Sequence, residues 1–168
     1  MPTNLLIKYN NLLEIDSLQE DQRENSLFRV FSRDIIDNQS FSFLSKKIHP
    51  TPQEGENKME ILFRHLTTKV IDPYTKKTEF ERERSIRLHW IKTHIDCCIP
   101  EGILIFSVDE PNGIKTYIFN KKENYIIVLE PLRKCAAYYL LTAFYIEGKD
   151  KEREKYLKKF KRRLSDIY

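Results

Sequence analysis

Glycine and cysteine are scarce in this chain of 168 residues, and each scarcity argues against a class of protein. With only four glycines, neither GxGxxG nor GxxxxGK followed by Ser or Thr can be written anywhere. Dinucleotide sites and Walker-type nucleotide sites are therefore not expected. The three cysteines, Cys97, Cys98 and Cys135, are odd in number and lack the CxxC spacing of zinc and redox motifs.

Long hydrophobic runs and metal-binding spacings are also missing. The longest weakly polar run, Cys135–Ile146, is too short to cross a membrane, and no basic segment followed by an apolar one opens the chain. The four histidines are scattered without HxxxH or HExxH spacing, so no metal site and no cofactor are expected. These absences predict a soluble, untargeted protein of the reducing cytoplasm.

Aromatic residues and basic charge are well represented. Ten Phe and nine Tyr can supply a core, so the chain is expected to fold alone. Residues 1–60 hold seven Lys or Arg against ten Asp or Glu, whereas residues 61–168 hold 22 against 15. The basic second part favours a polyanionic partner, although mixed surfaces of this kind also occur in ordinary soluble proteins.

The organisation of the chain suggests an N-terminal extension followed by one domain. A breaker cluster at Pro50–Gly55 reads as a linker or exposed loop. We expect residues 1–56 to be a partly helical extension of unknown function, with an extended segment at Phe41–Ile48. Residues 57–168 are expected to form the main domain.

Two helices are predicted at the start of that domain. Asn57 can cap the first, in which Met59, Leu62, Phe63, Leu66 and Val70 follow helical spacing. A turn is expected at Asp72–Thr75. The capping box at Thr78–Glu81 then predicts a second helix that continues to about Asp96.

From Ile103 onward, the apolar residues recur with a period of two. Short runs at Ile103–Val108, Ile114–Asn120, Tyr125–Glu130 and Ala136–Ile146 predict a four-stranded antiparallel meander, with a hairpin at Asn112-Gly113. The segment Lys149–Tyr168 is expected to be a basic helix. The predicted fold class is α+β.

The second predicted helix places an imidazole among cations. Helical rotation puts five polar residues on one face: Arg82, Ser85, His89, Lys92 and Asp96. A cation and a histidine near neutrality suit chemistry on a phosphodiester, because one stabilises growing negative charge and the other moves a proton. The alternative is a solvated charged face. His94 and Arg87, beside Glu83, indicate surface ion pairing.

Other candidate residues each have a structural alternative, which is favoured for His65, Thr142 and Tyr117. His65 lies at the edge of an apolar stripe, Thr142 is a polar residue in an apolar strand, and Tyr117 can stack on a base or pack in a sheet. The C-terminal basic face can follow a nucleic-acid backbone or simply aid solubility. Its residues are Lys155, Lys158, Lys159, Arg162 and Arg163.

Two stretches resemble a known superfamily. Phe80–Lys92, then a strand meander, then Leu141–Tyr145 before a basic helix resemble phage-borne nuclease domains of the barnase, EndoU, colicin and RelE-like superfamily. The resemblance covers roughly residues 57–165. It implies a compact helix-plus-antiparallel-sheet domain, a metal-independent ribonuclease that acts as a toxin on tRNA or mRNA, and a cognate inhibitor protein as a possible partner.

The resemblance also implies a mechanism and a set of site residues. A ribose 2′-hydroxyl would attack the adjacent phosphate and leave a cyclic phosphate and a free 5′-hydroxyl. His89 would be the general acid or base, Arg82 and Lys92 would hold the phosphate, and Thr142 would belong to the site. His65 is the candidate for the complementary proton transfer.

Two other functions stay open from the sequence. One is a non-catalytic RNA- or DNA-binding module that uses the same basic helix. The other is a protein interaction domain, such as a toxin neutraliser, whose apolar N-terminal segment docks a partner.

Overall fold

The chain folds as two compact units, each formed by two separate stretches of sequence. The computed structural model describes residues 4–52, 57–97, 101–148 and 150–168. Unit 1 is formed by residues 1–41 and 52–93, and unit 2 by residues 42–51 and 94–168. The predicted boundary near residue 56 adjoins residues 53–56, which lie outside the described part of the chain.

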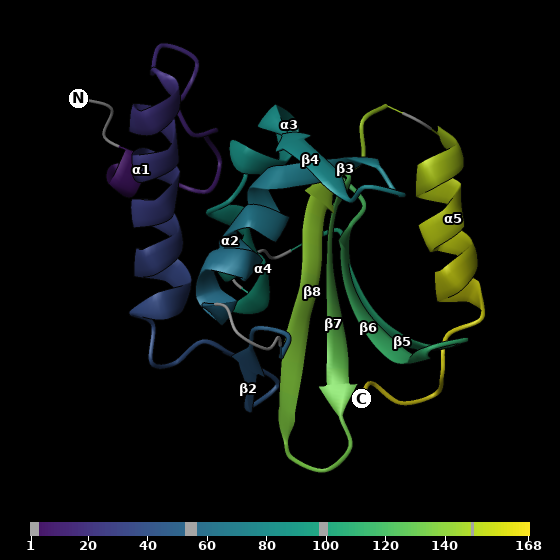
Figure 1. Ribbon diagram of the computed structural model, residues 1–168. Coiled ribbons are helices and arrows are strands. Elements are labelled where there is room, and N and C mark those ends of the chain that lie inside the picture. Colours follow the sequence, from purple (N-terminus) through teal and green to yellow (C-terminus); the bar gives the residue numbers. More distant parts are fainter. Residues whose placement is uncertain (1–3, 53–56, 98–100, 149) are drawn as a thin grey trace. The chain divides into compact units, whose positions relative to one another are not determined.

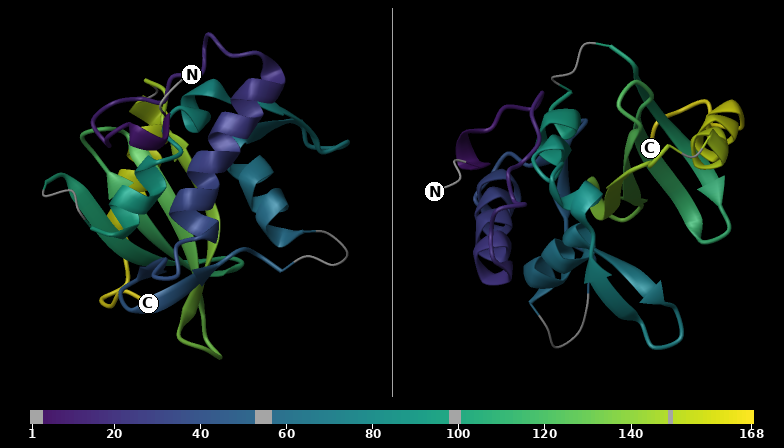
Figure 2. Two further views of the ribbon diagram at one scale, coloured as in Figure 1. Left: turned by 90° about the vertical axis from the view of Figure 1, so that its left-hand side faces the viewer. Right: turned by 90° about the horizontal axis from the view of Figure 1, so that it is seen from above.

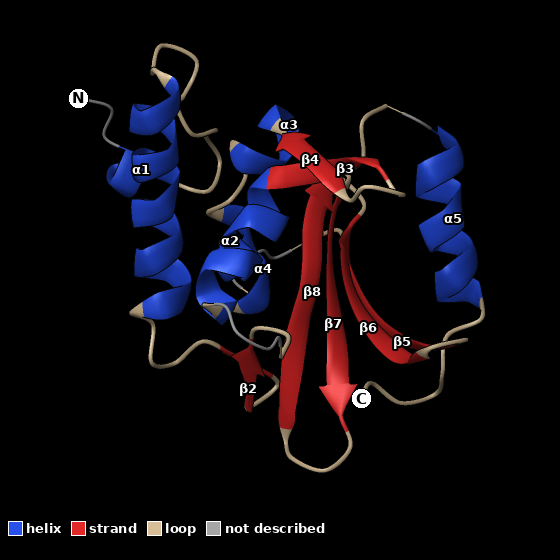
Figure 3. Ribbon diagram, viewed as in Figure 1, coloured by secondary structure: helices blue, strands red, loops and turns tan. Residues whose placement is uncertain are grey.

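Unit 1 is mainly helical, with one pair of strands (Figure 3). In chain order it contains η1 (Asn4–Leu6), α1 (Glu20–Phe31), the π-helical η2 (Ser32–Ile36), α2 (Lys58–Thr67), β3 (Thr68–Asp72), β4 (Lys77–Phe80) and α3 (Arg82–Ser85). Helix α4 (Trp90–Ile95) begins in unit 1 and ends in unit 2.

Helix α2 begins where the sequence predicts it. The Asn57 side chain accepts a hydrogen bond from the Met59 backbone N–H at 3.0 Å, which satisfies one of the free donors of the first turn. Leu66 is fully buried, and the Phe63 ring lies 5.1 Å from Phe28 and 5.4 Å from Phe31 of α1. These aromatic contacts hold α1 against α2 in the core of unit 1.

The predicted continuous helix from Thr78 to Asp96 does not form, because β4 takes its start and only the two short helices α3 and α4 lie within its range. Residues 77–80 instead pair with β3 across the expected turn at Asp72–Thr75, and the Glu81 N–H donates to the Thr67 carbonyl at 2.9 Å. After α3 the chain makes i→i−3 hydrogen bonds, such as Leu88 N–H to Ser85 O at 3.1 Å. The pairing of β3 with β4 therefore outweighs the local capping signal, and the predicted continuous polar face does not form.

Unit 2 is built on a curved sheet of six strands, with the order β1-β2-β8-β7-β6-β5 (Figure 1). Its elements are β1 (Ser42–Phe43), β2 (Lys46–His49), β5 (Ile103–Glu110), β6 (Gly113–Asn120), β7 (Tyr125–Leu132), β8 (Ala137–Tyr145) and α5 (Asp150–Lys161). The four strands from β5 to β8 pair antiparallel in sequence order, as predicted. The α+β class is confirmed, but the predicted four-stranded sheet is incomplete.

The two additional strands come from the N-terminal part of the chain. Strand β2 pairs in parallel with β8, with Lys47 opposite Ala137 and His49 opposite Tyr139, and β1 pairs antiparallel with β2. The sheet is therefore mixed. The predicted extended segment at Phe41–Ile48 contributes both strands, although its sequence does not show which strand it pairs with.

Helix α5 covers one face of this sheet and forms the main apolar core of unit 2 (Figure 1). Tyr156 is 6% exposed and contacts the rings of Phe119 and Phe144. Phe160 meets Phe106 edge to face, with ring centroids 5.3 Å apart. The apolar side of the predicted basic helix is therefore used for packing.

A network of hydroxyl groups fixes the last residue against the sheet of unit 2. The Ser107 and Thr116 hydroxyls are 2.8 Å apart, and both side chains are fully buried. The backbone oxygen of Tyr168 accepts from Thr116 at 2.9 Å and from the Tyr138 hydroxyl at 2.5 Å, and its N–H donates to Ser107 at 3.0 Å. Each of these hydroxyls thus has a partner.

Two further observations bear on the sequence expectations. Cys97 and Cys135 are exposed, whereas Cys98 lies outside the described residues. Within the parts of the chain that the structure describes, no helix has the length and apolar character needed to cross a bilayer.

Candidate functional site

His89 is the most deeply buried of the predicted site residues. It lies between α3 and α4, is 4% exposed, and its Nε2 is 2.9 Å from the Asn11 carbonyl oxygen. Because a carbonyl only accepts, Nε2 carries the proton, and the neutral ring keeps a lone pair on Nδ1. Among the described residues, the buried Nδ1 has no hydrogen-bond partner.

The surroundings of His89 favour the neutral imidazole. Burial lowers the pKa of His89 below its usual value, because charging the ring inside the protein loses hydration. The carbonyls of Asn11 and Lys8 and the Asp34 carboxylate oppose this shift, while Arg33 adds to it. The ring is therefore uncharged near neutrality, which is the state of a general base.

His89 borders a surface cavity of about 290 Å³ in unit 1. The cavity is lined by Ile7, Tyr9, Arg33, Asp34, His89, Lys92 and Thr93. It brings together the ion pair of Arg33 and Asp34, the Lys92 side chain, two hydroxyl-bearing side chains and the neutral ring. We call these seven residues the His89 cavity.

Arg33 is held in position at the His89 cavity. Its Nε and Nη2 donate to the two carboxylate oxygens of Asp34 at 2.6 and 2.9 Å, and Nη1 donates to the Leu5 carbonyl at 2.5 Å. Asp34 is 4% exposed and lies in η2. The guanidinium is thus oriented before any ligand arrives, which lowers the entropic cost of binding an anion.

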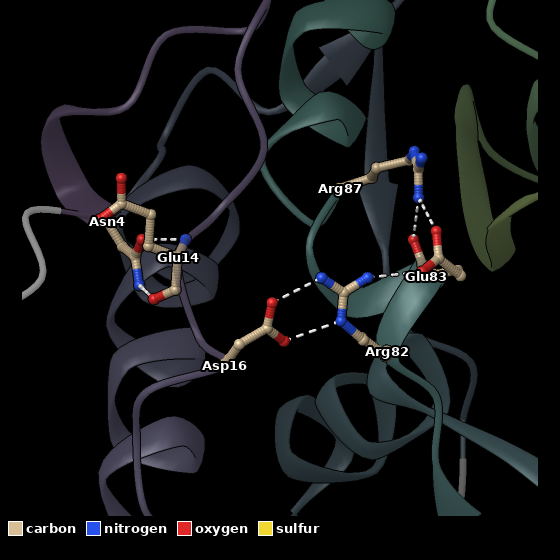
Figure 4. Close-up of polar contacts among 6 residues, drawn as sticks. All are labelled: Asn4, Glu14, Asp16, Arg82, Glu83 and Arg87. Carbon is tan, nitrogen blue, oxygen red and sulfur yellow. Dashed lines mark hydrogen bonds and ion pairs between the residues drawn. The ribbon is translucent and has the colours of Figure 1, made fainter.

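Arg82, a predicted phosphate ligand, has carboxylate partners instead (Figure 4). Its Nε and Nη2 donate to Asp16 at 2.8 and 2.6 Å, and its Nη1 donates to Glu83 at 2.6 Å. The hydrogen bond to Asp16, followed by the one to Glu83, raises the pKa of Arg82. Arg82 is not among the residues that line the His89 cavity, so the structure does not group it with His89 and Lys92.

Asp16 belongs to an N-terminal segment that Asn4 holds in place. The Asn4 amide donates to the Glu14 carbonyl at 3.0 Å, and its oxygen accepts from the Glu14 N–H at 2.8 Å (Figure 4). The amide also donates to the Ser26 hydroxyl at 2.8 Å. Asn4 is 2% exposed. This anchor fixes both ends of the stretch that carries Asn11, the partner of His89.

Of the remaining predicted catalytic residues, His65 and Thr142 are not among those that line the His89 cavity. His65 is exposed on α2, and its backbone carbonyl accepts from Arg84 at 2.8 Å. Thr142 is half-buried in β8 of unit 2, opposite Val128. Lys92 lines the cavity together with His89, as the sequence predicts. His94 is not a surface residue as predicted, because it is 1% exposed and accepts from the Asn120 amide at 3.0 Å.

The predicted pair of Arg87 and Glu83 does form, with Nη1 of Arg87 2.9 Å from the Glu83 carboxylate. Arg87 is nevertheless 8% exposed, so this pair lies at the edge of the core. Hydrogen bonding from Arg87 is the largest influence on the pKa of Glu83, which is lowered.

The predicted RNA-binding residues of α5 and of the two positions after it divide into packed and exposed side chains. Lys159 forms an ion pair with Glu110, and Arg162 donates to the same carboxylate at 3.3 Å. Burial opposes ionisation of Glu110, but the bonds from Lys159 and Tyr117 lower its pKa overall. Arg163 lies 4.1 Å from the Phe160 ring centroid, while Lys155 and Lys158 are exposed.

Tyr117 does not suit the predicted role of stacking on a base. It is 5% exposed, its ring stacks on Phe106 at 5.2 Å, and its hydroxyl donates to Glu110 at 2.9 Å. Burial, with the bond to Glu110, raises its pKa. The ring is part of the core of unit 2.

Unit 2 has a larger surface cavity of about 720 Å³. It is lined by Lys46, Asn112, Gly113, Ile114, Glu130, Pro131, Leu132, Arg133 and Tyr168. None of the predicted site residues lines it. Glu130 is paired with Lys115, so its carboxylate is already compensated.

Sequence reasoning missed Arg33, Asp34 and Thr93 as neighbours of His89. The adjacent Arg33-Asp34 pair stands in the apolar stretch between Val30 and Ile36, which was a signal of a buried ion pair.

In the described ranges, no three His, Cys, Asp or Glu side chains form a group that could hold a metal ion. Comparisons of the chain with known protein families, curated proteins and solved structures find no match.

Proposed function

We propose that this protein binds RNA and cleaves it without a metal ion at the His89 cavity. The observation that supports this most is the neutral, half-bonded His89 beside Arg33 and Lys92 in one cavity. A phosphate bound beside Lys92 and the pair of Arg33 and Asp34 gains stabilisation from the two cations as the transition state forms, with part of the Arg33 charge offset by Asp34. The imidazole supplies the base that such a reaction requires.

The proposed reaction is an internal transfer within the RNA strand. Nδ1 of His89 takes the proton of a ribose 2′-hydroxyl, and the 2′-oxygen attacks the adjacent phosphorus. The bond to the 5′-oxygen breaks, and that oxygen leaves with a proton. The Lys92 ammonium is a donor within the cavity, so it takes the role that the sequence gave to His65. The products are a 2′,3′-cyclic phosphate and a 5′-hydroxyl.

The decisive experiment incubates purified protein and excess chelator with labelled tRNA or mRNA. We expect cleavage and cyclic-phosphate ends. His89→Gln keeps an N–H for the Asn11 carbonyl but removes the base, so it should lower the rate by at least about 100-fold. Lys92→Gln removes the proposed proton donor. Its matched control is Lys58→Gln, which changes an exposed cation of unit 1 outside the cavity. Unchanged cleavage by His89→Gln would remove this site from the mechanism.

A non-catalytic nucleic-acid-binding module is the second candidate. It is favoured by the burial of Nδ1, because a side chain must shift before any hydroxyl can approach that atom. In this case His89 holds the N-terminal segment through Asn11 and has no chemical role. RNA that binds but stays intact in the same assay would select this candidate. Location in the cytoplasm and a cognate inhibitor stay predictions.

A further inference from the structure

The strands β3 and β4 form a two-stranded arm on unit 1. They pair only with each other among the described strands, and they extend away from the helices of their unit (Figure 2). At the tip Tyr74 is 96% exposed, and on β3 Val70 is 56% and Ile71 43% exposed. An aromatic ring so fully exposed is unusual, since burying a tyrosine removes a large apolar area from water.

The tip of the arm is held in one conformation. The Asp72 carboxylate accepts from the Tyr74 N–H at 2.9 Å and from the Thr75 hydroxyl at 2.7 Å. These bonds, with Thr75 the larger influence, lower the pKa of Asp72. Lys76 has a φ of 56°, in the left-handed region that closes the turn. Tyr74 is therefore presented by an ordered turn, which reduces the entropy lost on binding.

The base of the arm is also fixed to its unit. Arg84 donates to the Thr68 carbonyl at 3.0 Å, and the Arg23 guanidinium lies 3.8 Å from the Phe80 ring centroid. Lys69 is 3.0 Å from Glu81 and 3.7 Å from Glu79. The base of the arm is thus anchored to unit 1, and the charge of Lys69 there is compensated by Glu79 and Glu81.

Two lysines give the tip of the arm a net positive charge. Lys76 and Lys77 are both exposed, and within the described ranges neither makes an ion pair. The only acidic residue of the turn is Asp72, whose carboxylate accepts two hydrogen bonds within the turn and stays negatively charged, so the two lysines leave the turn with a net positive charge. An open aromatic ring next to two free cations complements an unpaired base flanked by phosphates.

We propose that the arm binds single-stranded RNA, with Tyr74 stacked on an unpaired base and Lys76 and Lys77 on the flanking phosphates. This inference rests on the proposed function for its choice of RNA, and it names single strands as the substrate class. A duplex does not fit, because its bases are already stacked on each other. A protein partner is the other occupant that Val70 and Ile71 could accept, and the test includes it.

The test measures the affinity of the full chain for a fluorescent single-stranded oligonucleotide with 2′-O-methyl groups, which cannot be cleaved. Tyr74→Ala should weaken binding by about 5- to 100-fold, the usual value for loss of one stacked base. Tyr74→Phe keeps the ring and should stay within about twofold of the wild type. The same sequence annealed into a duplex should bind more weakly than the single strand.

The two lysines are tested with a double variant and a matched control. Lys76→Gln with Lys77→Gln should flatten the slope of log affinity against log salt by about 1.4, or about 0.7 for each phosphate contact on a single strand. Lys121 and Lys122 are adjacent and exposed in the turn after β6, so their Gln variants are the control. Circular dichroism checks that each variant is folded.

The outcomes separate this inference from the proposed function. If cleavable RNA is cut but Tyr74→Ala binds as tightly as the wild type, the arm proposal is wrong and the enzyme proposal stands. If binding depends on Tyr74 but cleavable RNA stays intact, the enzyme proposal alone fails. Equal affinity for duplex and single strand, or no binding of either, overturns the arm proposal and leaves a protein as the occupant.

Discussion

Two buried polar sites, one in each unit, are hydrogen-bonded in different ways. In unit 2, Ser107, Thr116 and Tyr138 form a closed network with the backbone of Tyr168, and Asn120 bonds both His94 and the Glu123 N–H. In unit 1, His89 is bonded on one side only and borders a cavity.

This difference separates groups that stabilise from groups that are available for chemistry. A closed polar network contributes stability and specifies one packing. Removing one member leaves its buried partners without a hydrogen bond, and this lowers the free energy of unfolding. A half-bonded ring at a cavity contributes less to stability, and its Nδ1 lone pair becomes available to a ligand once the side chain that covers it shifts. We therefore expect substitutions in the network of unit 2 to act on stability, and those at the His89 cavity to act on function.

Asn120→Ala should have the largest effect on stability. Asn120 is 1% exposed, and its loss leaves His94 Nε2 and the Glu123 N–H without the partner seen here. The free energy of unfolding, measured by urea denaturation, should fall by about 2–3 kcal/mol. Asn112→Ala, at an exposed turn of the same unit, is the control. Equal effects of the two changes would mean that the buried amide has no special role.

Substitutions of Lys159 and Lys158 should distinguish the packed side of α5 from its exposed side by their effects on stability. Lys159→Met removes the cation that compensates the mostly buried Glu110, and should lower the free energy of unfolding by about 1–2 kcal/mol. Lys158→Gln changes an exposed side chain and should alter stability by less than about 0.5 kcal/mol. If Lys158→Gln also leaves RNA affinity and its salt dependence unchanged, this exposed cation does not contact phosphate.

The pH dependence of stability should reveal the neutral state of His89. Its pKa is lowered in the folded protein, so the unfolded chain binds the proton more readily. The stabilising contribution is complete above a pH of about 6.5 and is lost as the pH falls below it. At pH 5.5 the loss should be at most about 1.4 kcal/mol. Urea denaturation at pH 7.5 and 5.5 should show a smaller difference for His89→Gln, and an equal difference would contradict the assignment.

Arg82→Gln should have the smallest effect. Its guanidinium is half exposed and bound to the surface carboxylates of Asp16 and Glu83, an arrangement that contributes little to stability. Cleavage should change much less than with Lys92→Gln, since only Lys92 lines the cavity. Parallel measurements of cleavage rate and melting temperature test this ranking. A larger loss of rate with Arg82→Gln would restore the phosphate role that the sequence predicted.

Signals confined to a few neighbouring residues predicted much of the fold. The Asn57 cap, the strands β5 to β8 and the basic helix α5 all follow from capping and periodicity. The helix over residues 78–96 was wrong because Thr78 and Phe80 are held by pairing with β3, a contact that no local pattern encodes. Strand β2 was missed as a sheet member for the same reason, since its partner β8 lies far along the chain.

The candidate site was predictable only in part. His89 and Lys92 were found together, because they share one short segment of sequence. Arg33 and Asp34 join them from the end of α1, and only the three-dimensional fold brings that turn to His89. Arg82 was misplaced because its role depended on an unbroken helix, whereas its true partner, Asp16, comes from the N-terminal segment.

The parallel pairing of β2 with β8 also has a kinetic consequence. Residues 50–136 are synthesised between these two strands, so β2 waits without its partner while most of the chain leaves the ribosome. Closing so long a loop is costly in entropy, and pairings of this range slow folding and leave strand edges open to aggregation. Unit 1 ends at residue 93 and can be complete before β8 is made. We therefore expect two refolding phases, with the slower one reporting the arrival of β8 beside β2.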